Sequence, residues 1–196
     1  MKRLFLAASC LPLATAPPAP AQTITSAHAT ALTAPKLEGG MAGSWTGTLF
    51  YRDYQTNKVT SLPVKTVITA GIDGVTLIRA STYDDGPRVG AVLITSAALY
   101  DLKAGTVTSV SLRRGRPVTV ETERVTVVAY TDATHWSVRF EADGEDDDKP
   151  AKLRTTQTRD GDRVVSVKEV LPASAVAAGW QFRNRTELRR DTGGVG

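Results

Sequence analysis

The chain has 196 residues, of which 41% are hydrophobic and 22% charged, with a formal net charge of +4 and a single cysteine. This composition excludes a disordered or collagen-like protein, and the length suits one domain that buries a core without disulfides. The sequence contains no run of eighteen apolar residues, so it offers no candidate for a membrane-spanning helix.

Residues 1–21 have the three regions of a secretory signal peptide. Two basic residues near the start are followed by an apolar stretch over residues 4–13 and a small-x-small site that ends at Ala21. Several prolines in this segment argue against a buried helix. We therefore expect cleavage after Ala21 and a mature protein that is periplasmic or secreted.

Cleavage would remove Lys2, Arg3 and Cys10. The formal net charge would fall from +4 to +2, because two positive charges are lost, and no thiol would remain. A mature chain without cysteine has no disulfide, no thiolate metal ligand and no cysteine nucleophile. The small residual charge gives no indication of nucleic-acid binding.

The next segment, residues 22–38, is rich in Ala, Ser and Thr and shows no hydrophobic period, so we expect a flexible lead-in outside the fold. The folded domain is predicted over residues 39–190, followed by a disordered Gly-rich tail over residues 191–196. Within the domain, frequent Val and Thr indicate β-strands.

Turn sequences recur at short intervals through the domain and divide it into strands. One or two of the middle segments are expected to merge. The expected strands lie near residues 44–54, 58–69, 75–83, 88–95, 97–102, 106–113, 117–129, 134–142, 151–159, 162–171 and 180–190. One short helical turn is predicted over residues 172–179, directly before the last strand.

Short turns between successive strands predict an antiparallel meander, and the absence of crossover helices argues against a parallel sheet. Such a meander must close into a barrel or fold into a two-sheet sandwich, because open edges promote aggregation. We favour an all-β closed barrel of eight to ten strands.

The start of the first strand, Gly43-Ser44-Trp45-Thr46-Gly47, resembles the G-x-W opening of lipocalins and related calycin barrels. The segments over residues 45–54, 144–151 and 182–185 are similar to secreted bacterial lipocalin-like proteins of unknown function. The resemblance spans about residues 40–190 and implies a barrel whose last strand pairs with its first.

Lipocalins carry an arginine near the end of the last strand that packs across this tryptophan at the barrel floor. The resemblance implies such a structural pair here. Arg190 is the first choice for the arginine, because it shares a face with Leu188, and Arg189 is the second. A desolvated contact of this kind contributes about 1–2 kcal/mol.

For function, we expect the barrel mouth to bind a small apolar or amphipathic molecule, with Tyr51, Asp53, Tyr130 and Trp136 as the candidate lining. Two alternatives remain open. The first is an envelope structural or interaction module whose barrel core is filled by side chains. The second is an enzyme that uses interior carboxylates such as Asp53.

Other chemistries have little support in the sequence. His135 alone cannot form a multi-histidine metal centre, and the acidic run over residues 141–148 lacks the glycine position of a calcium loop. The nucleotide-binding glycine motifs and the aromatic spacing of single-strand binders are absent. We therefore expect no catalytic residue, metal, cofactor or nucleic-acid partner, and a monomeric protein.

Overall fold

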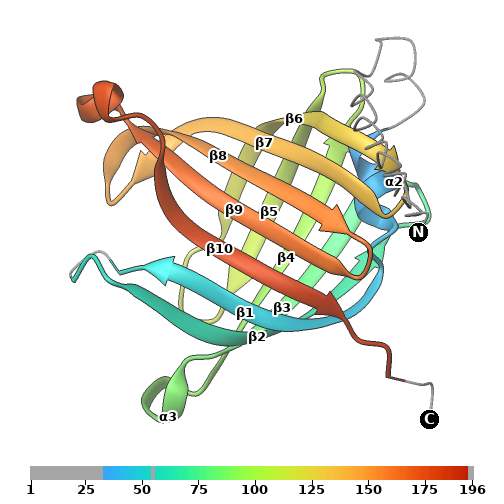
Figure 1. Cartoon of the computed structure of the whole chain (residues 1–196), viewed down its shortest axis with the longest axis horizontal. Helices are drawn as coiled ribbons and strands as arrows, with labels where there is room; N and C mark the ends of the chain where they lie inside the picture. The colour runs from blue at the N-terminus through green and yellow to red at the C-terminus, as the bar shows by residue number, and fades with distance from the viewer. Residues whose placement is uncertain (1–32, 54–55, 194–196) are drawn as a thin grey trace, which may run out of the picture.

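The computed structural model describes residues 33–53 and 56–193, and ten antiparallel strands make up most of them. Figure 1 shows the strands wrapped around a common interior. Their bounds are β1 (Gly43–Arg52), β2 (Val59–Ala70), β3 (Thr76–Asp84), β4 (Ala91–Asp101), β5 (Thr106–Arg113), β6 (Thr119–Asp132), β7 (His135–Asp146), β8 (Lys149–Asp160), β9 (Arg163–Pro172) and β10 (Gln181–Arg190).

Each strand pairs with the next along the chain, and β10 pairs with β1 to close the barrel. The closing ladder runs from Trp45 opposite Arg190 to Tyr51 opposite Asn184. Closure leaves no strand of this sheet with an unpaired edge. The predicted all-β meander barrel is therefore confirmed, with the 3-10 helix η1 (Ala173–Ala178) directly before the last strand.

Two features of the strands differ from the sequence-based boundaries. The segments expected at 88–95 and 97–102 form one strand, β4, and a short helix, α3 (Gly86–Val89), precedes it. The β7–β8 hairpin extends almost to its tip, because Asp147 and Asp148 adopt φ values of 54° and 57°. Two consecutive left-handed residues form a tight hairpin turn, and aspartate tolerates this conformation better than most residues.

The folded unit begins earlier than the sequence indicated. Helix α2 (Ala34–Gly39) lies in the segment predicted to be a flexible lead-in, yet Ala34, Leu37 and Glu38 are buried. Pro35 lies in the first turn of the helix, where its missing N–H costs nothing. One helical turn is too short to show a hydrophobic period in the sequence, so only the packing reveals it. The other residues of that segment, 22–32, and the predicted signal peptide lie outside the described residues.

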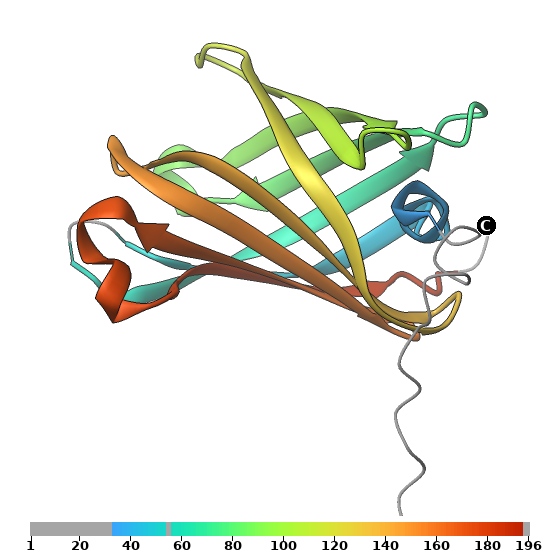
Figure 2. The same cartoon turned by 90° about the horizontal axis from the view of Figure 1, so that it is seen from above.

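Helix α2 lies at one end of the barrel, and η1 lies at the other, as Figure 2 shows. Leu37 belongs to the same buried cluster as Met41, Trp45, Tyr100 and Trp136 at the helix end, which we call the closed end. The opposite end, which carries the loop after β1, α3 and η1, is the open end. None of the helices in the described ranges has the length and apolarity needed to cross a bilayer.

Candidate ligand site in the barrel lumen

The strand register identifies the side chains that point into the barrel. Residues directly opposite each other on neighbouring strands share a face of the sheet. Trp45, which is 1% exposed, lies opposite Thr66, and Thr66 lies opposite Ser81. Arg79 is two residues before Ser81 and opposite buried Ile68, so it also points into the lumen.

Solvent reaches this inner face. The side chain of Arg79 is 37% exposed, although a continuous ladder of strands surrounds it. Inward-facing Thr155, Ser166 and Lys168, on the opposite wall, are also only partly buried. Part of the inner face is therefore accessible to solvent, although the closed end is packed with side chains.

The lower part of the lumen contains a polar cluster, the floor cluster, formed by Glu38, Arg79, Gln157 and Ser166. Gln157 Nε2 donates to Glu38 Oε1, and Ser166 Oγ donates to Gln157 Oε1 at 3.0 Å. Arg79 Nη2 lies 3.4 Å from Glu38 Oε2 and 3.5 Å from Gln157 Oε1. Residues of β3 and β8 thus contact the carboxyl group of α2 directly, and β9 joins the cluster through Gln157.

Glu38 supplies the carboxyl group of the floor cluster. Burial raises its pKa to about 7, and the positive charge of Arg79 opposes this effect only in part. Its side chain is 4% exposed, so the carboxyl is enclosed, and Gln157 Nε2, which donates to it, also lies 3.7 Å from the Met41 sulfur. A substrate in the lumen would not reach this carboxyl directly, which argues against Glu38 as a general acid or base.

Tyr100 of β4 extends the floor cluster toward β6. The residue is 7% exposed, and burial, followed by the charge of Glu38, raises the pKa of its phenol. Its hydroxyl makes no hydrogen bond to the described residues, yet the oxygen is not fully enclosed. The phenol is therefore a neutral donor next to the lumen with no protein acceptor among those residues.

Higher in the lumen, two acidic residues of β6 face one lysine of β9. Glu121 and Glu123 point inward, because they lie opposite inward Ser109 and Val107. Burial and then the neighbouring Glu121 raise the pKa of Glu123, whereas Lys168 lowers it. Lys168 therefore interacts electrostatically with Glu123 in the upper lumen, and Arg79 is the cation of the floor cluster.

The structure separates the four residues predicted to line the ligand site. Tyr51 points inward near the open end, opposite Asn184. Asp53 follows β1 at the same end and accepts hydrogen bonds from the Thr56 backbone N–H at 2.7 Å and from its hydroxyl at 2.9 Å. Tyr130 and Trp136 lie opposite each other at the closed end, where Trp136 is 2% exposed. The four residues therefore do not form one lining.

At the closed end, the guanidinium of Arg190 lies 4.7 Å from the centre of the Trp45 ring. Arg190 also donates to the carbonyls of Ala42 at 3.0 Å and Gly40 at 3.1 Å. A second arginine, Arg159, lies 5.9 Å from the same ring and donates to Gly40 O at 3.0 Å. Arg189 is exposed and lies opposite Thr46 on the outer face.

Sequence reasoning did not single out Glu38, Arg79 or Gln157. Arg79 had a readable signal, because it has the same parity in its strand as Leu77, Ser81 and Tyr83, and an arginine on the inner face of a strand requires a partner or solvent. Glu38 had no such sequence signal, since nothing in the sequence indicated that its segment packs against the barrel.

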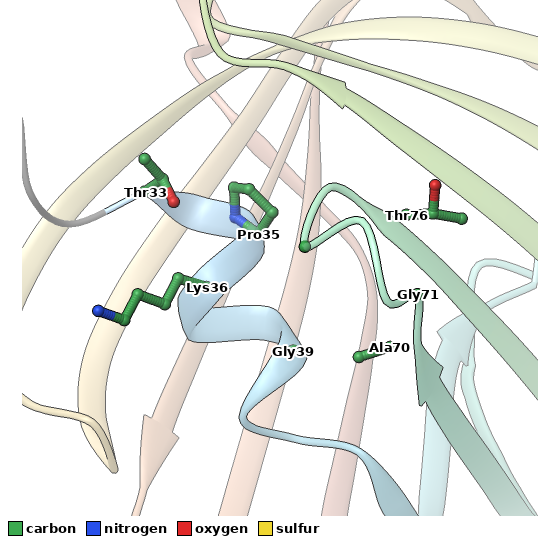
Figure 3. A pocket seen from close by; sticks show the side chains of 8 residues that line it. Thr33, Pro35, Lys36, Gly39, Ala70, Gly71 and Thr76 are labelled. Atoms are coloured by element: carbon green, nitrogen blue, oxygen red, sulfur yellow. The ribbon is translucent and has the colours of Figure 1, made fainter.

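A separate pocket of about 340 Å³ lies between α2 and the β2–β3 turn, outside the lumen. Small side chains and backbone form most of its wall, including Pro35, Gly39, Ala70 and Gly71. Figure 3 shows Lys36, the charged residue among those that line it, pointing away from the turn. This pocket lacks the converging polar groups of the lumen floor.

Comparison with known proteins supports the fold and goes no further. No family model matches the chain, and no curated protein matches it. Among solved structures, the chain is similar to Rv2717c from M. tuberculosis, with a TM-score of 0.55 and 16% sequence identity over 81% of this chain and 99% of that one. At this identity the likeness concerns the barrel architecture.

Proposed function

We propose that this protein binds a small amphipathic molecule in the barrel lumen. The observation that carries the proposal is the inward Arg79, whose side chain is 37% exposed inside a closed barrel. A concave interior that is accessible to solvent and presents a few converging polar groups is the usual form of a small-molecule site. Burial of the apolar part would supply about 25 cal/mol per Å².

The ligand would enter from the open end, because Trp45 and Met41 pack beneath α2 at the closed end. Tyr51 and Asp53 lie at this entrance and remain our candidates for contacts with an entering ligand. Tyr130 and Trp136 lie at the opposite end, where Trp136 belongs to the buried core. We leave these two residues out of the proposed ligand site.

We propose that the protein is a distant member of the lipocalin-like barrels. The G-x-W sequence over Gly43–Trp45 supports this relation, as does the position of Arg190 over the Trp45 ring. Shared architecture does not define a ligand, so the chemical class of the ligand must come from the lumen itself.

We also propose export, with cleavage after Ala21. N-terminal sequencing of the protein isolated from the cell envelope or medium of its own host should begin at Gln22. Recovery from the cytoplasm with residues 1–21 intact would contradict export. That result would leave the proposal for the lumen unaffected.

Native mass spectrometry of protein purified from its own host tests ligand binding. We expect a bound mass that is lost on denaturation and appears in the organic extract.

Two matched variants locate the bound molecule. Ser96→Trp places an indole inside the lumen opposite Arg79, whereas Thr95→Trp places it on the outer face. The bound mass should disappear in S96W and persist in T95W. A persistent mass in both variants would place the ligand outside the lumen, and protein that neither carries nor takes up an amphipathic probe would overturn the proposal.

A further inference from the structure

The floor of the lumen presents one cation whose donors are not all used. Of the Arg79 nitrogens, Nη2 has hydrogen-bond partners in Glu38 and Gln157. The remaining guanidinium donors have no acceptor among the described residues, and they are not enclosed by protein. A guanidinium with free N–H groups presents a planar fork that matches a carboxylate.

From this geometry we propose that the ligand carries a carboxylate head group that binds the unused N–H groups of Arg79, and that Glu38 takes up a proton when the carboxylate binds. The inference rests on the proposed function, because it names the chemical class of the molecule in the lumen.

Several features favour a monoanion over other head groups. An ammonium group would meet Arg79 and would be repelled. A neutral alcohol would leave the charge of Arg79 without a counterion whenever Glu38 is protonated. A doubly charged phosphate would meet Arg79 as the single cation of the floor cluster and would face Glu123 and Glu121 above it, since Lys168 already interacts with Glu123. One guanidinium fork matches a single carboxylate.

Proton uptake follows from the groups that face Glu38. Arg79 on β3 provides the positive charge that favours its ionised form, and Gln157 on β8 donates to it. Tyr100 on β4 and Glu123 on β6 are the further titratable groups of this part of the lumen, and Ser166 on β9 is neutral. A carboxylate bound to Arg79 would compensate the charge that stabilises ionised Glu38. The pKa of Glu38 would then rise further, and its proton would be retained.

This coupling predicts an unusual pH dependence. Carboxylate ligands that are already ionised should bind more tightly at about pH 6 than at about pH 8, because ionised Glu38 competes for Arg79 at the higher pH. Simple pairing of an arginine with a carboxylate gives no such change in this range, since an arginine does not titrate there.

The test compares dodecanoate, dodecanol and dodecylamine as probes of one tail with three head groups, by isothermal titration calorimetry on the full-length protein. We expect dodecanoate to bind most tightly. Arg79→Gln should weaken dodecanoate roughly tenfold or more and leave dodecanol nearly unchanged. Arg79→Lys keeps the charge and should recover part of the loss. The matched control is Arg189→Gln, which removes an arginine from the outer face and should have no effect.

Proton uptake is measured by repeating the titration in buffers of different ionisation enthalpy. Wild-type protein should take up a fraction of a proton with dodecanoate near pH 7.5, and Glu38→Gln should take up none and lose the pH dependence. Equal affinity for the three probes would overturn the carboxylate inference and leave lumen binding standing. Failure of all three probes to bind would contradict the proposed function itself.

Discussion

At the scale of single residues, Glu38 is the most informative group in this protein. Its carboxyl is buried where, among the described residues, Gln157 and Arg79 compensate for the lost water. A buried carboxyl with a raised pKa stabilises the folded state only while it keeps its proton. The stability of the folded state, in which α2 packs against the barrel, therefore depends on pH through Glu38.

The free energy of unfolding should show this pH dependence. The folded state holds the Glu38 proton up to about pH 7, whereas the unfolded chain releases it near the ordinary value of 4.5. The contribution of this group to the free energy of unfolding is therefore fully present below the lower value. It is lost as the pH rises between the two, by up to about 3 kcal/mol.

Urea denaturation of wild type and Glu38→Gln from about pH 5 to about pH 8 measures the effect. The variant should become the more stable protein as the pH rises, because glutamine has no proton to lose. Glu145→Gln, on an exposed carboxylate of β7, serves as the control and should show no such trend. A difference between E38Q and wild type that stays constant with pH would contradict the raised pKa.

The closed end offers a second prediction at this scale. Arg190→Met keeps the apolar stem but removes the contact with Trp45 and two hydrogen bonds to carbonyls. We expect a loss of about 2–3 kcal/mol in the free energy of unfolding. Arg189→Met, one residue away on the outer face, should stay within about 0.5 kcal/mol of wild type. Equal effects of the two substitutions would show that the contact with Trp45 contributes little.

At the scale of elements, closure of the barrel depends on how near β1 and β10 approach each other. Gly47 permits this approach, because a Cβ atom built there would lie 1.8 Å from the carbonyl oxygen of Glu187. The backbone of β10 cannot move aside as easily as a flexible side chain can. Gly144 in β7 is a useful contrast, since a Cβ atom there would meet the flexible Leu153 side chain at 2.9 Å.

Gly47→Ala should therefore destabilise the protein by about 3 kcal/mol or more, because β10 must move away from β1. Gly144→Ala should cost less than about 1 kcal/mol, because Leu153 can adopt another rotamer. Thermal unfolding compares the two, and amide exchange should show faster opening of the β1–β10 ladder in G47A alone. Similar losses in both variants would argue that the β1–β10 contact does not limit closure.

The strands could be predicted from the sequence, whereas helix α2 could not. Turn residues and β-branched residues identified the order of the strands, because each strand is set by local contacts with its neighbours. Helix α2 was not predicted, since one turn of helix depends on Leu37 and Met41 packing into a barrel that forms from distant segments. The segments expected over residues 88–95 and 97–102 form the single strand β4, in agreement with the expectation that one or two middle segments merge.

At the scale of the whole molecule, the barrel is closed at one end by packed aromatic residues and α2, and part of its inner face is accessible to solvent. The sequence could not predict which side chains share the lumen floor. Glu38 and Gln157 are 119 residues apart, and Arg79 and Gln157 are 78 apart. Only the register around the closed barrel brings them together, and a shift by one residue would turn each inward side chain outward.

Thiol labelling tests the central claim, a lumen that is open to solvent and to ligand. In a Cys10→Ser background, Ser96→Cys places one thiol inside, opposite Arg79, and Thr95→Cys places one outside. A small thiol reagent should modify both native proteins, and dodecanoate should protect only the inner thiol. An inner thiol that reacts only after unfolding, or one that dodecanoate protects no better than the outer thiol, would contradict the account.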